Sequence, residues 1–117
     1  MKNFEKGGLN IIIEEGDLNI IKWIGKSGEP KPSEFLIPYF DSLIKNLKGK
    51  DLEILFSTLD YMNSSTVPSI INFTKKLNEN NIKTIIVYNK NSKWQTASFK
   101  AFNTIARSMK NIEVVGR

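Results

Sequence analysis

The sequence predicts an α/β domain with a mixed β-sheet and three helices, in the order β-β-α-β-α-β-α-β. Near its start, the apolar runs 9–13 and 18–24 are rich in β-branched residues and are separated by the polar segment 14–17, which predicts an antiparallel hairpin. Further on, segments with apolar residues every three or four positions alternate with short continuous apolar runs. Because alternating strands and helices require right-handed crossovers, we expect the rest of the sheet to be mainly parallel.

A Gly- and Pro-rich loop, residues 25–33, follows the hairpin and precedes the first helix. We expect this helix over residues 37–48, because apolar side chains recur there at helical spacing up to Gly49. Pro38 has no backbone N–H to donate, so the helix should begin close to Pro38 or bend there. Residues 51–58 then have the composition of a strand.

Two more helix–strand pairs complete the predicted order. A second helix is expected over residues 66–79, and the nearly continuous apolar run 82–88 that follows it is typical of an interior strand. A third helix is expected over residues 95–109, before a short strand at 112–115. The prediction is therefore a sheet of four or five strands, with helices mainly on one face.

The residue types missing from the sequence exclude several classes of enzyme. With no Cys and no His, the chain has no thiolate nucleophile, no zinc–thiolate cluster and no Ser-His-Asp triad. Its glycines form neither a phosphate-binding loop nor a dinucleotide fingerprint. No apolar run approaches the ~18 residues that cross a bilayer, and the first residues lack the apolar segment of a secretory signal. We therefore expect one cytoplasmic domain over residues 1–117, without catalytic activity, metal or organic cofactor.

The net charge of +5 is unevenly distributed along the chain. Residues 1–58 carry 8 basic and 9 acidic side chains, whereas residues 59–117 carry 9 basic and 3 acidic ones. Lys93, Lys100 and Arg107 recur every seven residues, so on a helix they form a basic stripe, which Lys110 extends. Such a stripe can bind nucleic acid or an acidic partner, or keep the protein soluble. We favour the solvated face, because only two of the 17 basic residues are Arg.

The strongest candidate for a functional site is the run of small polar residues Asn63-Ser64-Ser65-Thr66, directly before the second helix. Such residues cap a helix by accepting hydrogen bonds from the free N–H groups of its first turn, which contributes ~1 kcal/mol, and Pro68 fits that turn. One cap residue would suffice, yet the sequence has four. A hydroxyl at this place is also suited to phosphorylation, because the helix dipole and the free amides favour negative charge.

The segment Leu59-Asp-Tyr-Met-Asn-Ser-Ser65, with the strand 52–56 before it and a helix after it, resembles the STAS domain, the SpoIIAA-like fold of anti-sigma-factor antagonists. That family has a strand, a turn of the form hydrophobic–Met/Phe–Asp–Ser–Ser–Gly and a helix, within the same order of elements. The resemblance covers residues 9–116 and implies a single STAS-like domain. The segment 93–98 is similar to one in a group of stand-alone STAS-like bacterial regulators.

This resemblance implies a non-catalytic partner-switching regulator that acts through the turn. In the family, the first Ser of the turn is phosphorylated by a partner kinase; here that residue is Ser64, with Ser65 as the alternative. The implied partners are a serine kinase of the GHKL-ATPase type, such as an anti-sigma factor, and a PP2C-type phosphatase that resets the switch. Asn63, Ser65 and Thr66 would surround Ser64 in the partner-binding surface. Asn63 replaces the family's Asp and Thr66 its Gly, which removes a negative charge and a residue suited to φ > 0.

Several alternatives stay open. The same site would serve a STAS-like activator of a partner enzyme, such as a nucleotide cyclase. A hydrolase built on Ser64 would need a base, and Asp60 is the only titratable group close to it in sequence. Nucleic-acid binding through the basic stripe is the third alternative. Trp94 is expected to pack at the start of the third helix; its functional alternative is an exposed anchor in the partner-binding surface.

Overall fold

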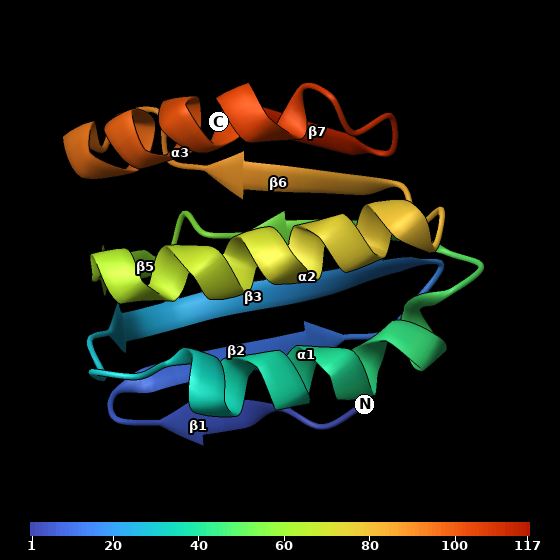
Figure 1. Ribbon diagram of the computed structural model, residues 1–117, viewed down its shortest axis with the longest axis horizontal. Helices are drawn as coiled ribbons and strands as arrows, with labels where there is room; N and C mark the ends of the chain where they lie inside the picture. Colours follow the sequence, from blue (N-terminus) through green and yellow to red (C-terminus); the bar gives the residue numbers. More distant parts are fainter.

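One mixed sheet with three helices makes up the protein, and the computed structural model describes residues 1–117 (Figure 1). The strands are β1 (Phe4–Lys6), β2 (Leu9–Glu14), β3 (Leu18–Ser27), β4 (Asp51–Leu55), β5 (Leu59–Met62), β6 (Thr84–Tyr88) and β7 (Ile112–Gly116). The helices are α1 (Ser33–Leu47), α2 (Val67–Glu79) and α3 (Lys93–Ala106), and the short 3₁₀ helix η1 (Ser64–Thr66) precedes α2. The predicted α/β class and the N-terminal hairpin are confirmed.

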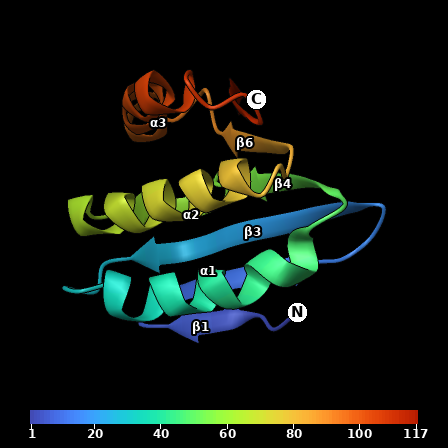
Figure 2. The same cartoon turned by 45° about the vertical axis from the view of Figure 1, so that its right-hand side comes forward.

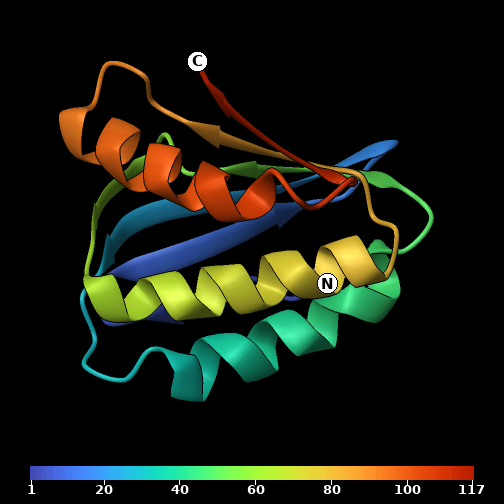
Figure 3. The same ribbon diagram turned by 45° about the horizontal axis from the view of Figure 1, so that its top comes forward.

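The order of the strands places every helix on the same face of the sheet. The strands lie in the order β1-β2-β3-β4-β6-β7, antiparallel from β1 to β3 and parallel from β3 to β7. Each new parallel strand is added on the same side of the last one, so each right-handed crossover carries its helix over the same face. Figures 2 and 3 show α1, α2 and α3 together on that face. β6 lies between β4 and β7, so the expected interior position of this strand is confirmed.

Two strands, β1 and β5, were not predicted, and the expected count of four or five strands is too low. β1 has three residues and β5 has four, too few for an alternating pattern to be recognised in the sequence. Both are defined by pairing: β1 lies antiparallel to β2, and β5 lies parallel to the second half of β3. Strand β5 therefore gives the segment before the candidate turn a fixed place next to β3.

Helix α1 begins at Ser33, earlier than predicted, and runs through Pro38. The missing N–H of Pro38 removes only one hydrogen bond of the helix. Leu36 and Phe40, on either side of Pro38, are both buried, and their helical spacing holds the two parts of α1 on the sheet. Tertiary packing therefore overrides the local break. None of the three helices has the length and apolarity needed to cross a membrane.

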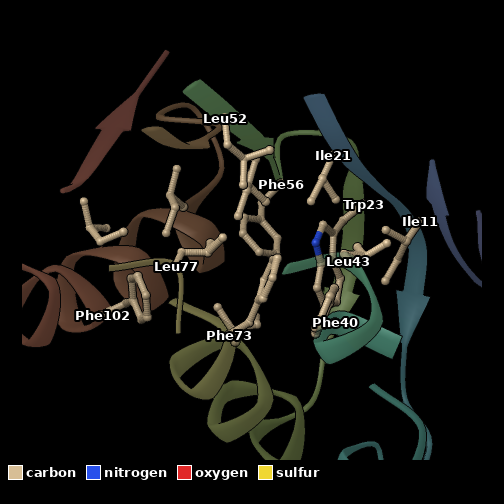
Figure 4. Packing of buried hydrophobic residues seen from close by; sticks show 14 of the residues in the cluster. Ile11, Ile21, Trp23, Phe40, Leu43, Leu52, Phe56, Phe73, Leu77 and Phe102 are labelled. Carbon is tan, nitrogen blue, oxygen red and sulfur yellow. The ribbon is translucent and has the colours of Figure 1, made fainter. Parts of the chain in front are cut away.

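An aromatic core joins the sheet to all three helices (Figure 4). Trp23 of β3 lies with its ring centroid 5.6 Å from that of Phe40 in α1 and 4.9 Å from that of Phe56, directly after β4. Phe40 stacks on Phe73 of α2 at 4.3 Å, and Phe56 contacts Phe99 of α3 at 4.8 Å. The middle of β3, the residue after β4 and the middle turns of all three helices are thus anchored around one cluster, which fixes how the helices lie on the sheet.

Candidate partner-binding site

The candidate turn lies at the carboxyl ends of the parallel strands, where open α/β sheets usually place their functional groups. The chain leaves β5, passes through Asn63 into η1 and continues into α2 (Figure 1). The end of β3 lies beside it, because the backbone N–H of Asn63 donates to the carbonyl of Ser27 at 2.9 Å. Two chain segments separated by more than thirty residues therefore meet at this edge.

Asn63 caps the short 3₁₀ helix η1, which continues directly into α2; α2 itself has no side-chain cap. Its Oδ1 accepts hydrogen bonds from the backbone N–H of Thr66 at 3.0 Å and from the Thr66 hydroxyl at 2.7 Å. Its Nδ2 donates to the carbonyl of Glu29 at 2.9 Å, in the loop after β3. An Asp, which the family resemblance would have at this position, could accept the first two bonds but could not donate the third. The departure from the family pattern thus has a structural reason.

Thr66 is fully buried, with 0% of its surface exposed, so it does not belong to an exposed partner-binding surface. This corrects the expectation from the sequence. Its Oγ1 lies 2.7 Å from the hydroxyl of Ser27. Because the proton of Thr66 Oγ1 is donated to Asn63, Ser27 must be the donor in that pair. The φ of Thr66 is −75°, so the turn needs no glycine here and the Thr-for-Gly replacement causes no strain.

Ser64 and Ser65 are the two members of the run that the fold does not use. Both are exposed, and neither hydroxyl forms a hydrogen bond, whereas Asn63 provides the cap. Of the four polar residues, Asn63 is therefore explained by capping and Thr66 by its buried contacts. The hydroxyls of Ser64 and Ser65 are left free just before α2. No hydrogen bond links either hydroxyl to Asp60, so the contact between nucleophile and base that a hydrolase needs is not formed.

Tyr61, two residues before the turn, is a further exposed side chain that the sequence reasoning missed. This side chain on β5 is 50% exposed, unusual for a large aromatic residue. It pairs in register with Lys26 of β3, which is also exposed. Nothing in the local sequence distinguished Tyr61, because the segment 59–62 was not predicted as a strand.

Gln95 is a second residue that the sequence reasoning missed. It lies in the first turn of α3, is only 1% exposed, and donates from Nε2 to the carbonyls of Phe56 at 2.8 Å and Leu59 at 2.9 Å. Its Oε1 accepts from the backbone N–H of Asn89 at 2.7 Å. One amide thus ties the link between β4 and β5 to the start of α3, and so holds the strand that leads into the turn.

Trp94, the neighbour of Gln95, is partly buried and packs against the hydrophobic core. The structure therefore favours its packing role over that of an exposed anchor. No cluster of three or more carboxylate, His or Cys side chains is arranged to hold a metal ion.

The sheet order, the single helix layer and the turn at the carboxyl end define the fold: it is the SpoIIAA-like fold of the STAS domain. An anti-sigma factor antagonist from Mycobacterium paratuberculosis superposes with a TM-score of 0.64 at 11% identity, covering 90% of this chain and 85% of that one. SpoIIAA, an anti-sigma factor antagonist in its unphosphorylated form, gives a TM-score of 0.56 at 15% identity, covering 86% of this chain and 98% of its own.

A third similar structure is a protein of the DUF3478 family with a SpoIIAA-like fold from Shewanella loihica PV-4. It has a TM-score of 0.56 at 14% identity and covers 100% of this chain and 93% of its own. No protein-family model and no curated protein matches the sequence. The similarity is therefore one of fold, and it confirms the predicted SpoIIAA-like architecture; the role of Ser64 stays a prediction.

Proposed function

We propose that the protein is a non-catalytic partner-switching regulator, which binds a regulatory protein through the surface around Ser64 and is controlled by phosphorylation of Ser64. The observation that carries this proposal is the division of roles within the turn. Asn63 caps η1 and Thr66 is buried, while the hydroxyls of Ser64 and Ser65 are exposed and form no hydrogen bonds. Hydroxyls that the fold does not need, at the start of a helix, are accessible to a kinase.

The electrostatics of the turn suit a reversible phosphate. A phosphoserine carries up to about −2 of charge. The first turn of α2 contains no acidic residue, so the helix dipole and its free amides stabilise that charge and the domain stays folded. A protein partner that packs around the neutral hydroxyl instead meets a bulky dianion, which imposes desolvation or like-charge repulsion. Phosphorylation would therefore weaken the complex without unfolding the regulator.

The proposed partners come from the family resemblance and from the similar structures. Two of these are anti-sigma factor antagonists, one of them solved in its unphosphorylated form. We assign to this chain a GHKL-type serine kinase or anti-sigma factor as the partner bound by the unphosphorylated form. A PP2C-type phosphatase would reset the switch. Such partners act in the cytoplasm, where we place the protein.

Within the partner-binding surface, we assign Ser64 as the phosphate acceptor, Ser65 as its neighbour and Tyr61 as the aromatic contact. Tyrosine is enriched in protein interfaces because it combines a large apolar ring with a polar hydroxyl. Tyr61 is the one large side chain of β5 that is exposed beside the turn. Asn63 supports this surface from beneath by holding the backbone, and does not need to contact the partner.

Paired substitutions at the two serines test the proposal. Binding of a candidate GHKL-type kinase is measured by calorimetry with Ser64→Ala and Ser64→Glu, and with Ser65→Ala and Ser65→Glu for comparison. We expect Ser64→Ala to bind constitutively and Ser64→Glu to bind at least about tenfold more weakly. Ser65→Ala should stay within about threefold of the unchanged protein, because it leaves the acceptor intact, and Ser65→Glu, which places its charge one residue away, should weaken binding less than Ser64→Glu.

Phosphopeptide mapping after incubation with the kinase and ATP provides the second measurement. We expect the phosphate on Ser64. Phosphate on Ser65 alone would mean that Ser65, and not Ser64, is the phosphate acceptor. Phosphate found only outside residues 63–66, or equal binding by all four variants, would contradict the proposed switch.

A further inference from the structure

The outer face of α3 carries a charge pattern that the switch at Ser64 does not explain. From Asn80 to Ile112 the sequence contains six basic residues and no carboxylate. The other two helices carry acidic as well as basic side chains: α1 includes Glu34 and Asp41, and α2 includes Glu79. α3 contains no acidic residue and lies at one side of the helix layer, packed on β6 and β7 (Figures 1 and 3).

The basic stripe of α3, formed by Lys93, Lys100 and Arg107, contributes nothing visible to the fold. All three side chains are exposed, and none forms an ion pair or a side-chain hydrogen bond; the ion pairs of the protein lie elsewhere. Lys93 lies in the first turn of α3, where the helix dipole disfavours a cation. Folding alone therefore gives no reason for a stripe of this sign at this place.

An apolar row runs beside the basic stripe on the same helix. Ala97, Ala101 and Ile105 follow one another at intervals of four residues, so they share one side of α3, and all three are exposed. Ile105 is 39% exposed and is one of the four large hydrophobic side chains of the protein that are exposed to solvent. The two alanines leave room for another helix to approach closely. Ala97 lies beside the stripe and Ala101 at its edge, whereas Ile105 is turned about 140° from Lys100 around the helix axis. The face that carries the stripe therefore includes the two alanines but not Ile105.

We propose that this face of α3 is a docking surface for an acidic protein segment, an amphipathic helix that places carboxylates on Lys93, Lys100 and Arg107 and small apolar side chains against Ala97 and Ala101. Charge complementarity selects an acidic partner. The two alanines and the single Arg of the stripe favour a protein over nucleic acid, which is bound mostly through phosphate contacts from dense basic surfaces. The surface lies on α3, a different helix from the one that Ser64 precedes.

A designed peptide serves as the probe. It is a helix of about 18 residues with Glu on one side and Leu and Ala on the other, labelled for fluorescence anisotropy. A peptide of the same composition in scrambled order and a DNA duplex are measured in parallel. We expect the amphipathic peptide to bind at least about tenfold more tightly than the scrambled one, because only the former presents acidic and apolar side chains along matching lines. The changes that the peptide causes in the NMR spectrum of the isotope-labelled protein should map to residues of α3.

Charge-matched variants locate the surface. The test variant is Lys93→Glu/Lys100→Glu/Arg107→Glu; the control is Lys45→Glu/Lys48→Glu/Lys75→Glu, three exposed lysines on or beside α1 and α2. Both change the net charge by the same amount, and circular dichroism verifies that both are folded. We expect the test variant to lose at least about tenfold in peptide affinity and the control to stay within about threefold.

Four outcomes would overturn the proposal: no peptide binding, equal binding of the scrambled peptide, equal loss in the two triple variants, or tighter binding of DNA than of the amphipathic peptide. None of these outcomes would contradict the proposed phosphorylation switch, because Ser64 is unchanged in every variant. Ala97→Gln adds a test of the apolar part, because it places a longer polar side chain where the peptide should approach closely. It should weaken the amphipathic peptide by about threefold and leave the scrambled peptide unaffected.

Discussion

The turn at residues 63–66 and the outer face of α3 are both rich in polar side chains, but these side chains do different things for the fold. In the turn, Asn63 and Thr66 are bonded to groups from β3 and the loop after it. On α3, no side chain of the basic stripe has a partner. The comparison teaches that composition does not separate a structural polar residue from a free one. Substitutions at side chains with buried partners should lower stability by about 1 kcal/mol or more, whereas substitutions at free ones should affect binding and change stability by no more than about 0.5 kcal/mol.

The largest effect is expected at Gln95, on the inner side of α3. Gln95→Leu removes all three hydrogen bonds of this side chain, so the carbonyl of Leu59 and the N–H of Asn89 lose their side-chain partner, while the carbonyl of Phe56 keeps the bond from the N–H of Leu59. We expect the free energy of unfolding to fall by about 3 kcal/mol or more, since each buried unsatisfied group costs ~1–3 kcal/mol. Urea denaturation followed by circular dichroism measures it. Thr104→Leu, on the exposed side of the same helix, is the control and should change stability by less than about 0.5 kcal/mol.

Thr66→Val should produce the next largest effect, because Val keeps the shape and removes the hydroxyl. The Ser27 hydroxyl then loses its acceptor in a buried place, and Asn63 loses one of its two donors. We expect a loss of about 2 kcal/mol in the same denaturation experiment. Ser65→Ala, one position away and exposed, should stay within about 0.5 kcal/mol. Equal losses for the two variants would mean that the division of roles within the turn is wrong.

Asn63→Asp introduces the residue that the resembling STAS turn pattern has at this position, and it should still destabilise this protein. The carboxylate keeps the cap but cannot donate to the carbonyl of Glu29, and it places negative charge against that oxygen. The attraction of the helix N-terminus offsets part of this cost, so we expect a net loss of about 1 kcal/mol. Asn91→Asp, an exposed change of the same charge, is the control. Increased stability in Asn63→Asp would show that the bond to Glu29 contributes nothing.

The smallest expected effect is an increase in stability. Lys93→Glu places an acid in the first turn of α3, where the helix dipole favours it, and breaks no contact. We expect the free energy of unfolding to rise by about 0.5 kcal/mol at low salt, and the gain to shrink as salt is added. A thermal melt at two ionic strengths measures it. A loss of stability would show that Lys93 has a structural partner, and would remove the contrast between the stripe and the turn.

The sequence by itself determined the α/β class, the N-terminal hairpin, the order of helices and strands, and the presence of a polar turn at the start of α2. These features depend on short-range patterns: apolar periodicity, β-branched runs and helix-start residues act within one element. The boundaries of α1 and the strands β1 and β5 escaped that reasoning. Their formation depends on packing or pairing with segments elsewhere in the chain.

Only the tertiary structure decided which polar residues of the turn are free. Asn63 and Thr66 are separated from Glu29 and Ser27 by 34 and 39 residues, and no local pattern encodes those contacts. Gln95 reaches Phe56 across 39 residues in the same way. A side chain's hydrogen-bond partners and burial are fixed when distant strands and helices meet, whereas its residue type fixes only what bonds it is able to make. Ser64 and Ser65 form no such bonds because it is their neighbours Asn63 and Thr66 that contact Glu29 and Ser27.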